Sequence, residues 1–337
     1  LAIASLVLHA SCMDIRPPVD WKPKPGYCSL KDIKLNIKDW FKFGLLGLAW
    51  GSSFLWIKIA VQEIGPVLLV TLRIAFSLIG LIIVVFFNRS RLPRPKQWLP
   101  FIVLGLTNVA LPFLLISWSE QRIDSGVASI LNSTVPLFTI LIAPIFLQEE
   151  RITVARIAGL ASGFIGVIIL MSRGLHGGAI TDVVGELTML LAAVLYAFSA
   201  VFARRATQAL KADVQALVQM ICAMVYLSIG LPVLDPSVSL PHLPLTWVAL
   251  AWLGLVGSCL GTLLFYSLLH SIGVTRTMLS TYIFPLVGVI LGILFLGEKV
   301  TWNLIAGGIL ILSGIYVVNS GIEIPTRLKA IFNHNPS

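Results

Sequence analysis

Few side chains that could bind a polar ligand lie inside the long apolar runs of this 337-residue chain. Arg73 is one of them: it lies seven residues after Pro66, about 10 Å into its run if the run is helical. Its guanidinium could bind a substrate carboxylate, but we favour a structural role, in which it extends toward water or pairs with Glu120 or Glu186. Lys58 lies nearer the end of its run and is predicted to anchor that end.

Asn132 lies one helical turn before Pro136, and Pro285 occupies the equivalent place in a later run. A proline inside a helix cannot donate to the carbonyl four residues earlier, which here is that of Asn132. A free carbonyl beside an amide would form a small hydrogen-bonding site, provided that the irregular backbone faces protein or a cavity. A hydrogen bond between helices explains Asn132 equally well. We predict that Pro136 and Pro285 break their helices and act in gating.

Other polar and aromatic residues lie on runs that we expect to face a shared cavity. Trp50 and Trp118 could stack on an aromatic substrate, although membrane tryptophans more often lie at the interface. With Asn132 and Arg73, the predicted substrate cavity comprises Trp50, Ser53, Asn108, Trp118, Tyr196, Ser199, Tyr266, Thr281 and Tyr282.

The sequence does not bring together groups for enzyme chemistry. All 15 Asp and Glu residues lie in tails, turns or the ends of the runs, and His270 lies at the end of its run, where an interfacial role is favoured. No zinc-ligand spacing, glycine-rich phosphate loop or ATP motif is present. The sequence therefore predicts no catalytic residues, no metal site and no cofactor.

The elements that would position these residues are long apolar segments. The chain is 57% apolar and 12% charged, whereas an ordinary soluble domain is about 25% charged. Runs of about 20 apolar residues, long enough to cross a bilayer, recur throughout. The sequence predicts an all-α integral membrane protein with ten transmembrane helices, at about 40–61, 66–87, 99–118, 125–147, 153–171, 183–203, 214–234, 245–269, 275–296 and 301–320.

Basic residues are concentrated in alternate connections between these segments. They precede the first run and follow every even-numbered run, whereas the other connections hold only Arg122, Arg173 and Lys299. The positive-inside rule then places both termini in the cytoplasm. The net charge of +9 is thus a topology signal, and its scatter over loops argues against nucleic-acid binding.

Part of the sequence occurs twice. Residues 105–149 align without a gap onto residues 254–298, with 11 identical positions. These include Gly105 and Gly254, Pro136 and Pro285, and Glu149 and Glu298. Each copy has five predicted spans, and because five is odd, the second copy enters the membrane from the opposite side. Two inverted five-helix halves, with a substrate site between them near the midplane, are typical of secondary transporters.

The predicted domain organisation follows from the repeat. It comprises a cytoplasmic segment (1–39), a first repeat (40–171), an external linker (172–182), a second repeat (183–320) and a cytoplasmic tail (321–337). Gly159 and Gly163, and likewise Gly288 and Gly292, would let helix backbones approach closely. We assign these glycines to helix packing, within one half or in a homodimer, and not to ligand contact.

The ten spans, the WGSSF stretch at 50–54, the arginine early in the second span and the FLGEKVT pattern at 295–301 resemble the EamA branch of the drug/metabolite transporter superfamily. The resemblance covers roughly residues 40–320 and is most specific at the two glutamate turns. The first half departs from the pattern, with Gln148 where the second half has Gly297. The resemblance implies a multi-pass plasma-membrane carrier, usually an exporter of amino acids or related small metabolites.

The favoured function is therefore a secondary transporter, not an enzyme, that exports small polar or zwitterionic metabolites, amino acids among them, by alternating access. Its expected partners are a small-molecule substrate and the lipid bilayer, and a bacterial inner membrane is the favoured location. One alternative is multidrug efflux of lipophilic cations, which usually needs a membrane-embedded glutamate that is not evident here. A second is an integral-membrane enzyme or scaffold that handles lipid, against which the inverted repeat argues.

The absence of acidic residues from the middle of the spans also bears on energy coupling. Glu120, Asp124 and Glu186 are expected to lie near water and to stay charged, unless closure of an outer gate buries one of them. We therefore predict that transport is not obligatorily proton-driven. If closure of the outer gate buries one of these acids and this prediction fails, Glu186 is the residue that we expect to be responsible.

Overall fold

The structure is a computed structural model that describes residues 37–146, 154–176, 180–206, 210–235, 239–272, 277 and 279–319. Every regular element in these residues is helical, and none of them forms a strand. Most of the predicted N-terminal segment, the whole predicted tail, Glu149 and the side chain of His270 lie outside the described residues.

The helices account for the predicted runs. Within the residues that the structure describes, seven are long and apolar enough to cross a membrane: Asp39–Ala60, Pro66–Phe87, Leu99–Glu120, Ser125–Ala143, Asp182–Ala203, Ala212–Leu234 and Pro244–Leu268. Three shorter apolar helices, Ile157–Ser172, Ser280–Leu296 and Trp302–Val317, coincide with the fifth, ninth and tenth runs. The chain is an all-α, multi-pass membrane protein, and its spans are numbered 1 to 10 below.

The first repeat forms spans 1 to 5, several of which are divided. Its elements are α2 (Ile37–Gly51) and α3 (Ser53–Ala60) in span 1, α4 (Pro66–Phe87) in span 2, η1 (Pro95–Trp98) before span 3, α5 (Leu99–Leu104), η2 (Gly105–Ala110) and α6 (Leu111–Glu120) in span 3, α7 (Ser125–Asn132) and α8 (Val135–Phe146) in span 4, and α9 (Val154–His176) in span 5.

The second repeat forms spans 6 to 10 in a similar way. Its elements are α10 (Ile180–Ala206) in span 6, α11 (Ala212–Leu234) in span 7, α12 (Pro244–Ala251), η3 (Trp252–Leu260) and α13 (Gly261–Ile272) in span 8, η4 (Leu279–Tyr282) and α15 (Ile283–Leu296) in span 9, and α16 (Trp302–Asn319) in span 10.

Spans 3 and 8 each contain a π-helical segment, in η2 and η3. The repeat offset carries residues 105–110 onto residues 254–259, which lie inside η3, so the same irregularity occurs at the same place in both halves. Extra π-type turns inside helices are often found at functional sites, because they change the direction in which side chains point.

Glycines let these segments cross spans of the other half. A Cβ at Gly254 in η3 would lie 2.3 Å from Phe76 Cβ and 2.7 Å from the carbonyl oxygen of Arg73, both in α4. A Cβ at Gly105 in η2 would lie 2.6 Å from Cys222 Cβ in α11. Span 8 therefore packs on span 2, and span 3 packs on span 7, through equivalent glycines.

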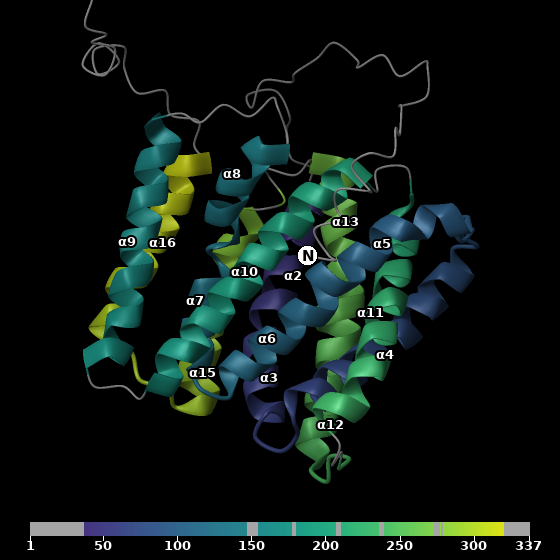
Figure 1. Ribbon diagram of the computed structural model, residues 1–337, viewed down its shortest axis with the longest axis horizontal. Helices are drawn as coiled ribbons and strands as arrows, with labels where there is room; N and C mark the ends of the chain where they lie inside the picture. Colours follow the sequence, from purple (N-terminus) through teal and green to yellow (C-terminus); the bar gives the residue numbers. More distant parts are fainter. Residues whose placement is uncertain are drawn as a thin grey trace, which may run out of the picture. The chain divides into compact units, whose positions relative to one another are not determined.

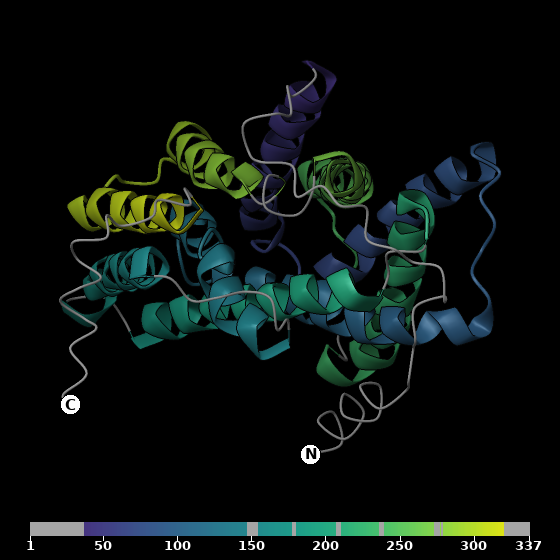
Figure 2. The same cartoon turned by 90° about the horizontal axis from the view of Figure 1, so that it is seen from above.

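Spans 5 and 10 also pack closely through glycines. Helices α9 and α16 lie side by side in two views (Figures 1 and 2). A Cβ at Gly314 would lie 2.4 Å from the carbonyl oxygen of Gly159 and 2.7 Å from the nitrogen of Gly163. Likewise, a Cβ at Gly288 in α15 would lie 2.5 Å from Ser129 in α7. These glycines therefore serve packing between the two halves of one chain, and Gly163 also packs within its own half, where its Cβ would lie 2.3 Å from Leu137 Cδ1.

Acidic side chains fasten one half to the other at both ends of the bundle. Between α3 and α4, Glu63 accepts hydrogen bonds from the backbone N–H of Leu243 (2.9 Å) and from the Thr246 hydroxyl, at the start of α12. In the first turn of α11, Asp213 accepts hydrogen bonds from Asn88 Nδ2 (3.1 Å) and Ser90 Oγ (2.6 Å). The end that carries Glu63 is called the outer end below, because the charge pattern predicts it to be external.

Candidate functional site

Arg73 is buried where α4 crosses η3. Its side chain is 4% exposed, its Nε donates a 2.8 Å hydrogen bond to Ser258 Oγ, and its guanidinium carbon lies 3.9 Å from the centre of the Phe113 ring. Gly257 leaves room here, since a Cβ at this position would lie 2.9 Å from Ser53 Oγ and 3.5 Å from Arg73 Nη2. No carboxylate in the described part of the chain pairs with the guanidinium. The expectation that Arg73 extends to water or pairs with an acid is therefore wrong.

Trp50 and Ser53 reach the same η3 segment from span 1. Trp50 Nε1 donates a 2.9 Å hydrogen bond to the carbonyl oxygen of Gly257, and its ring lies against Phe265 and Phe284, with ring centres 5.5 and 5.7 Å away. Ser53 Oγ donates to the carbonyl oxygen of Ala49 at 3.0 Å. The structure thus gathers two predicted cavity residues with Arg73 around Gly257.

Three other predicted cavity residues are engaged by neighbouring side chains or backbone. Tyr266 donates a 2.9 Å hydrogen bond to Gln219 Oε1 in span 7, and Ser199 donates a 2.8 Å hydrogen bond to Thr107 Oγ1 in span 3. At the outer end, the guanidinium carbon of Arg122 lies over the Trp118 ring, 3.4 Å from the centre of the ring. These contacts are between helices or at a helix end, as in ordinary packing.

Span 4 is interrupted directly after Asn132. Helix α7 ends there and α8 begins at Val135, so that Pro136 lies in the first turn of the new helix. Asn132 is 9% exposed, and its Oδ1 accepts no hydrogen bond from the described part of the chain. Span 9 changes at the equivalent position, where η4 ends at Tyr282 and α15 begins shortly before Pro285. Asn132 therefore offers a buried acceptor at a helix break.

The other predicted cavity residues lie close to these irregular segments. Asn108 is half-buried within η2, and Thr281 and Tyr282 lie in η4, where Thr281 is 7% exposed. Tyr196 of α10 is among the residues that interact electrostatically with Arg73. Four predicted cavity residues thus lie on irregular segments of spans 3 and 9 or at the break in span 4. The irregular segment of span 8 contacts two others, Trp50 and Arg73.

Glu120 is the main feature that sequence reasoning misplaced. It is 0% exposed, and neither carboxylate oxygen accepts a hydrogen bond from the described part of the chain. Lys58 Nζ lies beside it but donates to the carbonyl oxygens of Glu120 and Ile123, both at 2.7 Å, so Lys58 anchors span 1 on the end of α6. Glu186 is also buried, at 5% exposure. The expectation is that both acids lie near water unless closure of an outer gate buries one of them; in this structure, with its outer end closed, both are buried.

The turn that carries Glu298 closes the outer end between the halves. Gly297 ends α15 with a φ of +66°, a left-handed conformation that glycine adopts easily. Glu298 is thereby directed at the start of α7, where Oε1 accepts from Ser125 N (2.6 Å) and Oε2 from Gly126 N (3.0 Å). These bonds cap the helix with a negative charge, which also suits its dipole.

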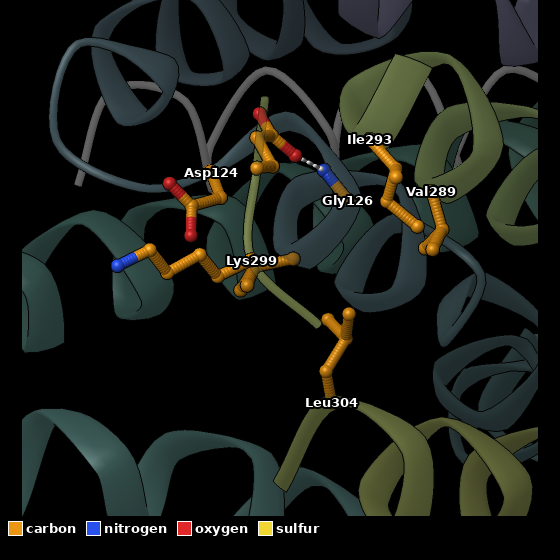
Figure 3. Close-up of a pocket in the computed structure, with 8 residues that line it drawn as sticks. Asp124, Gly126, Val289, Ile293, Lys299 and Leu304 are labelled. Atoms are coloured by element: carbon orange, nitrogen blue, oxygen red, sulfur yellow. Dashed lines mark hydrogen bonds between the residues drawn. The ribbon is translucent and has the colours of Figure 1, made fainter. Parts of the chain in front are cut away.

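A small pocket lies beside this cap (Figure 3). Its lining consists of Asp124, Gly126, Val127, Val289, Ile293, Glu298, Lys299 and Leu304. The helix N-terminus here is already occupied by the chain's own carboxylate. We therefore treat this pocket as part of the closed outer end and not as the substrate site.

Two signals in the sequence could have indicated the missed residues. Phe113, Ser117 and Glu120 recur at helical spacing, which places them on one face of α6. Gly257 and Ser258 form a small polar pair inside an otherwise apolar span. Neither signal identifies the partner helix, which only the structure supplies.

Comparisons with known proteins agree with this architecture. The model of the EamA-like transporter family matches residues 41–172 and again residues 183–320. An "Uncharacterized transporter" of Archaeoglobus fulgidus is 28% identical, over 84% of this chain and 99% of that protein. A "Probable amino-acid metabolite efflux pump" of Salmonella typhimurium is 26% identical, over 86% of this chain and 97% of that protein.

A further relative and a solved structure extend the similarity. A "Probable terminal-alkyne amino-acid exporter" of Streptantibioticus cattleyicolor is 27% identical, over 81% of this chain and 90% of that protein. A solved crystal structure shares the fold, with a TM-score of 0.62 and 19% identity over 85% of this chain and 99% of that one. Because the family model matches most of both halves, this chain belongs to the EamA-like transporter family.

Proposed function

We propose that this chain is a secondary transporter that exports small polar or zwitterionic metabolites, amino acids among them, across the plasma membrane by alternating access. The names of two relatives, an amino-acid metabolite efflux pump and an amino-acid exporter, support this proposal. A related transporter of Escherichia coli, YedA, is described as an inner-membrane protein, which supports the location.

The observation that carries the substrate class is the buried guanidinium of Arg73. Placing an arginine within a span costs about 2.5–3.5 kcal/mol on insertion scales, and buried charges normally have partners of opposite charge. Ser258 holds Nε, whereas Nη1 and Nη2 have no hydrogen-bond partner in the described part of the chain. A substrate carboxylate could accept two parallel hydrogen bonds from these nitrogens.

The interrupted spans support movement around this site. Transporters with inverted repeats commonly bind substrate where helices are broken, and alternate access by moving one bundle against another. Here π-helical segments occur at equivalent places in spans 3 and 8, and the α-helix is interrupted or begins anew at equivalent places in spans 4 and 9. The fastened outer end, at Glu63 and Glu298, would have to open on release to the outside.

The burial of Glu120 favours the alternative function, efflux of lipophilic cations, because such pumps usually use a membrane-embedded carboxylate. Two cations, Lys58 and Arg73, interact electrostatically with it, however. A substrate with only a positive charge would be repelled by both, whereas a carboxylated substrate would neutralise Arg73. We therefore retain the metabolite exporter as the proposal.

Transport in proteoliposomes tests this proposal directly. The purified protein is assayed with a panel of labelled amino acids, with and without a pH gradient, as the wild type and as Arg73→Gln. We expect Arg73→Gln to lower the rate for carboxylated substrates about 10- to 100-fold, as loss of a hydrogen bond to a charged group costs about 1.5–3 kcal/mol. Arg122→Gln, which removes an arginine from the Trp118 stack, is the matched control and should keep its rate.

The opposite result is equally informative. Faster movement of lipophilic cations than of any amino acid by the wild type, with no effect of Arg73→Gln, would establish the alternative function. Equal rates in wild type and Arg73→Gln for an amino acid would place its carboxylate elsewhere.

Asn132 provides a second test of the cavity. Asn132→Leu removes the unpartnered acceptor while keeping a side chain of similar size, so transport should be lost with insertion and thermal stability nearly unchanged. If the variant instead fails to fold, Asn132 is a packing element and the site lies elsewhere.

The proposed orientation, with both termini in the cytoplasm, rests on the distribution of basic residues. We expect activity from a reporter that works only in the cytoplasm when it is fused after Ser337. Activity of a reporter that works only outside the cytoplasm would contradict the ten-span topology.

A further inference from the structure

Glu120 and Arg73 are two buried, oppositely charged groups that do not meet. Arg73 is 4% exposed and Glu120 is 0% exposed. Each interacts electrostatically with the other, but neither Glu120 oxygen accepts a hydrogen bond from the described part of the chain. A direct ion pair would satisfy both groups, so their separation needs an explanation.

The two groups are connected along one face of α6. Phe113, which contacts the Arg73 guanidinium, is followed by Ser117 and Glu120 at helical spacing. Ser117 is 0% exposed, and its hydroxyl also has no hydrogen-bond partner among the described residues. This face therefore leads from Arg73 toward the outer end past buried polar atoms that the protein leaves unsatisfied. Such atoms are rare in native structures and need a water or ligand partner.

The other charges near Glu120 are already engaged. Lys58 donates to the backbone carbonyls of Glu120 and Ile123, and Glu298 accepts from the backbone of α7. Lys58, Glu298 and Arg73 are the charged groups that interact with Glu120. When Glu120 is ionised, the set comprises two positive and two negative charges, so a ligand with no net charge leaves it balanced.

We propose that Arg73 and Glu120 are the two poles of one site for a zwitterion, in which Arg73 binds the substrate carboxylate and Glu120 binds its ammonium group. The site rests on the proposed function, which it narrows to substrates that carry both charges. A zwitterion supplies each pole with its missing partner and leaves the local charge balanced. An anion or a cation of the same size satisfies one pole only and leaves the other buried and unpaired, which is unfavourable.

Competition with matched analogues separates the two poles. The amino acid that moves fastest in the panel serves as label; for leucine, the unlabelled competitors are leucine, 4-methylpentanoate (no amino group) and 3-methylbutylamine (no carboxylate). The concentration that halves the labelled flux is measured for each competitor. Competition avoids the passive leak of the analogues through lipid, and stabilisation of the detergent-purified protein against heat by each competitor gives a second readout that needs no flux.

In the wild type we expect each analogue to compete at least about tenfold more weakly than leucine, as each leaves one charged group unpaired. In Glu120→Gln, leucine and 4-methylpentanoate should become equal within about twofold, while 3-methylbutylamine stays weak. In Arg73→Gln, leucine and 3-methylbutylamine should become equal instead. Glu120→Asp keeps the charge and should retain part of the preference for leucine over 4-methylpentanoate.

Glu63→Gln is the matched carboxylate control at the same end of the bundle. It should preserve both preferences, even if less folded protein is recovered, because a ratio between competitors does not depend on the amount of protein.

Several results would overturn the two-pole site. If Glu120→Gln weakens all three competitors equally, Glu120 supports the fold only. If Glu120→Gln abolishes a response to the pH gradient and keeps the preference for leucine, Glu120 binds a proton and not the substrate. If the wild type binds 4-methylpentanoate as well as leucine, Glu120 is not a pole, and the proposed carboxylate exporter stands without it. If the wild type neither transports nor binds any amino acid of the panel, the proposed function and the two-pole site both fail.

Discussion

Span 8 crosses span 2 at Gly254, and span 3 crosses span 7 at Gly105, the repeat partner of Gly254. At both crossings a π-helical segment lies on a long α-helix of the other half, α4 or α11, and at both a Cβ on the glycine would collide with that helix. An acidic residue before or at the start of each of these helices also bonds to the other half, Glu63 at one end and Asp213 at the other. The same packing arrangement therefore occurs at both crossings.

The side chains at the two crossings are not alike. The first has Arg73 bonded to Ser258. In the second, Gly105 meets Cys222 and Ala223 where Gly254 meets Phe76 and Ser77 in the first. Gln219 is therefore the counterpart of Arg73, Val109 is that of Ser258, and Glu120 corresponds to Leu269. Both charges of the proposed site thus lie in the first repeat. The two halves therefore share the packing at the crossings and differ in the side chains that the proposed site would use.

The largest expected effect concerns the shared packing. Gly254→Leu and Gly105→Leu should both prevent folding, because the new side chain would meet backbone atoms, the Arg73 oxygen at 2.7 Å and the Ala223 nitrogen at 2.9 Å, and overpacking alone costs about 1–3 kcal/mol or more. Size-exclusion chromatography of detergent extracts measures the folded fraction. Gly44→Leu is the control, since a Cβ at Gly44 would meet nothing within 4 Å. A normal folded peak for Gly254→Leu would show that the crossing is not close.

The second prediction moves the charge to the other crossing. Gln219→Arg should lower the free energy of unfolding by about 2.5–3.5 kcal/mol, the cost of an unpaired arginine within a span. Gln219 is buried, at 1% exposure. Adding Val109→Ser should recover part of this loss, because it supplies the hydroxyl that Ser258 gives to Arg73. Thermal unfolding of the two single variants and the double variant measures the coupling, and strictly additive effects would mean that the crossings differ in more than these side chains.

Much of the fold could be predicted because it depends on local composition and on periodicity. Apolar runs of bilayer length predict the spans, and the duplicated phrase around Glu149 and Glu298 predicts two related halves. The interruption of span 4 also has a local cause, since Pro136 cannot donate to the carbonyl of Asn132. These features need no knowledge of neighbouring helices.

The site was less predictable because burial depends on which helices meet. Glu120 lies at the end of its span, where a carboxylate ordinarily reaches water, and it is buried only because other parts of the chain pack on this end of α6. Arg73 lies deep in its span, yet its role depends on Ser258 and Phe113, which are 185 and 40 residues away in the chain. Trp50 and Tyr266 are aromatic side chains with a polar group, the type expected to line a cavity, but each donates a hydrogen bond to a neighbouring span instead.

A third, smaller effect concerns the outer end. Glu298→Ala should lower the free energy of unfolding by about 0.5–2 kcal/mol, the usual cost of removing a helix N-cap. Both backbone bonds to α7, from Ser125 and Gly126, are lost in this variant. Glu298→Gln should cost less, as its amide oxygen can accept one of them. Lys299→Gln is the control beside the same pocket (Figure 3) and should change stability by less than about 0.5 kcal/mol. Equal losses for Glu298→Ala and Lys299→Gln would contradict the capping role.

The smallest effect is expected at Glu63, the second acid that fastens the outer end, and it should depend on pH. The hydroxyl of Thr246 donates to its carboxylate and lowers the pKa of Glu63 below the ordinary 4.5; backbone N–H donors and the charge of His242 act in the same direction, whereas partial burial opposes them. A carboxylate with a lowered pKa in the folded state stabilises the protein fully above its unfolded pKa and loses this contribution as pH falls through the folded value.

Glu63→Gln should therefore lower the unfolding temperature near neutral pH, and the difference from the wild type should shrink as pH falls below 4.5. Thermal unfolding of wild type, Glu63→Gln and Thr246→Val across this range measures it. Thr246→Val removes the main cause of the pKa shift, so its difference from the wild type should shrink over the same range. A deficit in Glu63→Gln that stays constant at all pH values would mean that Glu63 acts through packing and not through its charge. In that case only Glu298, of the two acids, would fasten the halves electrostatically.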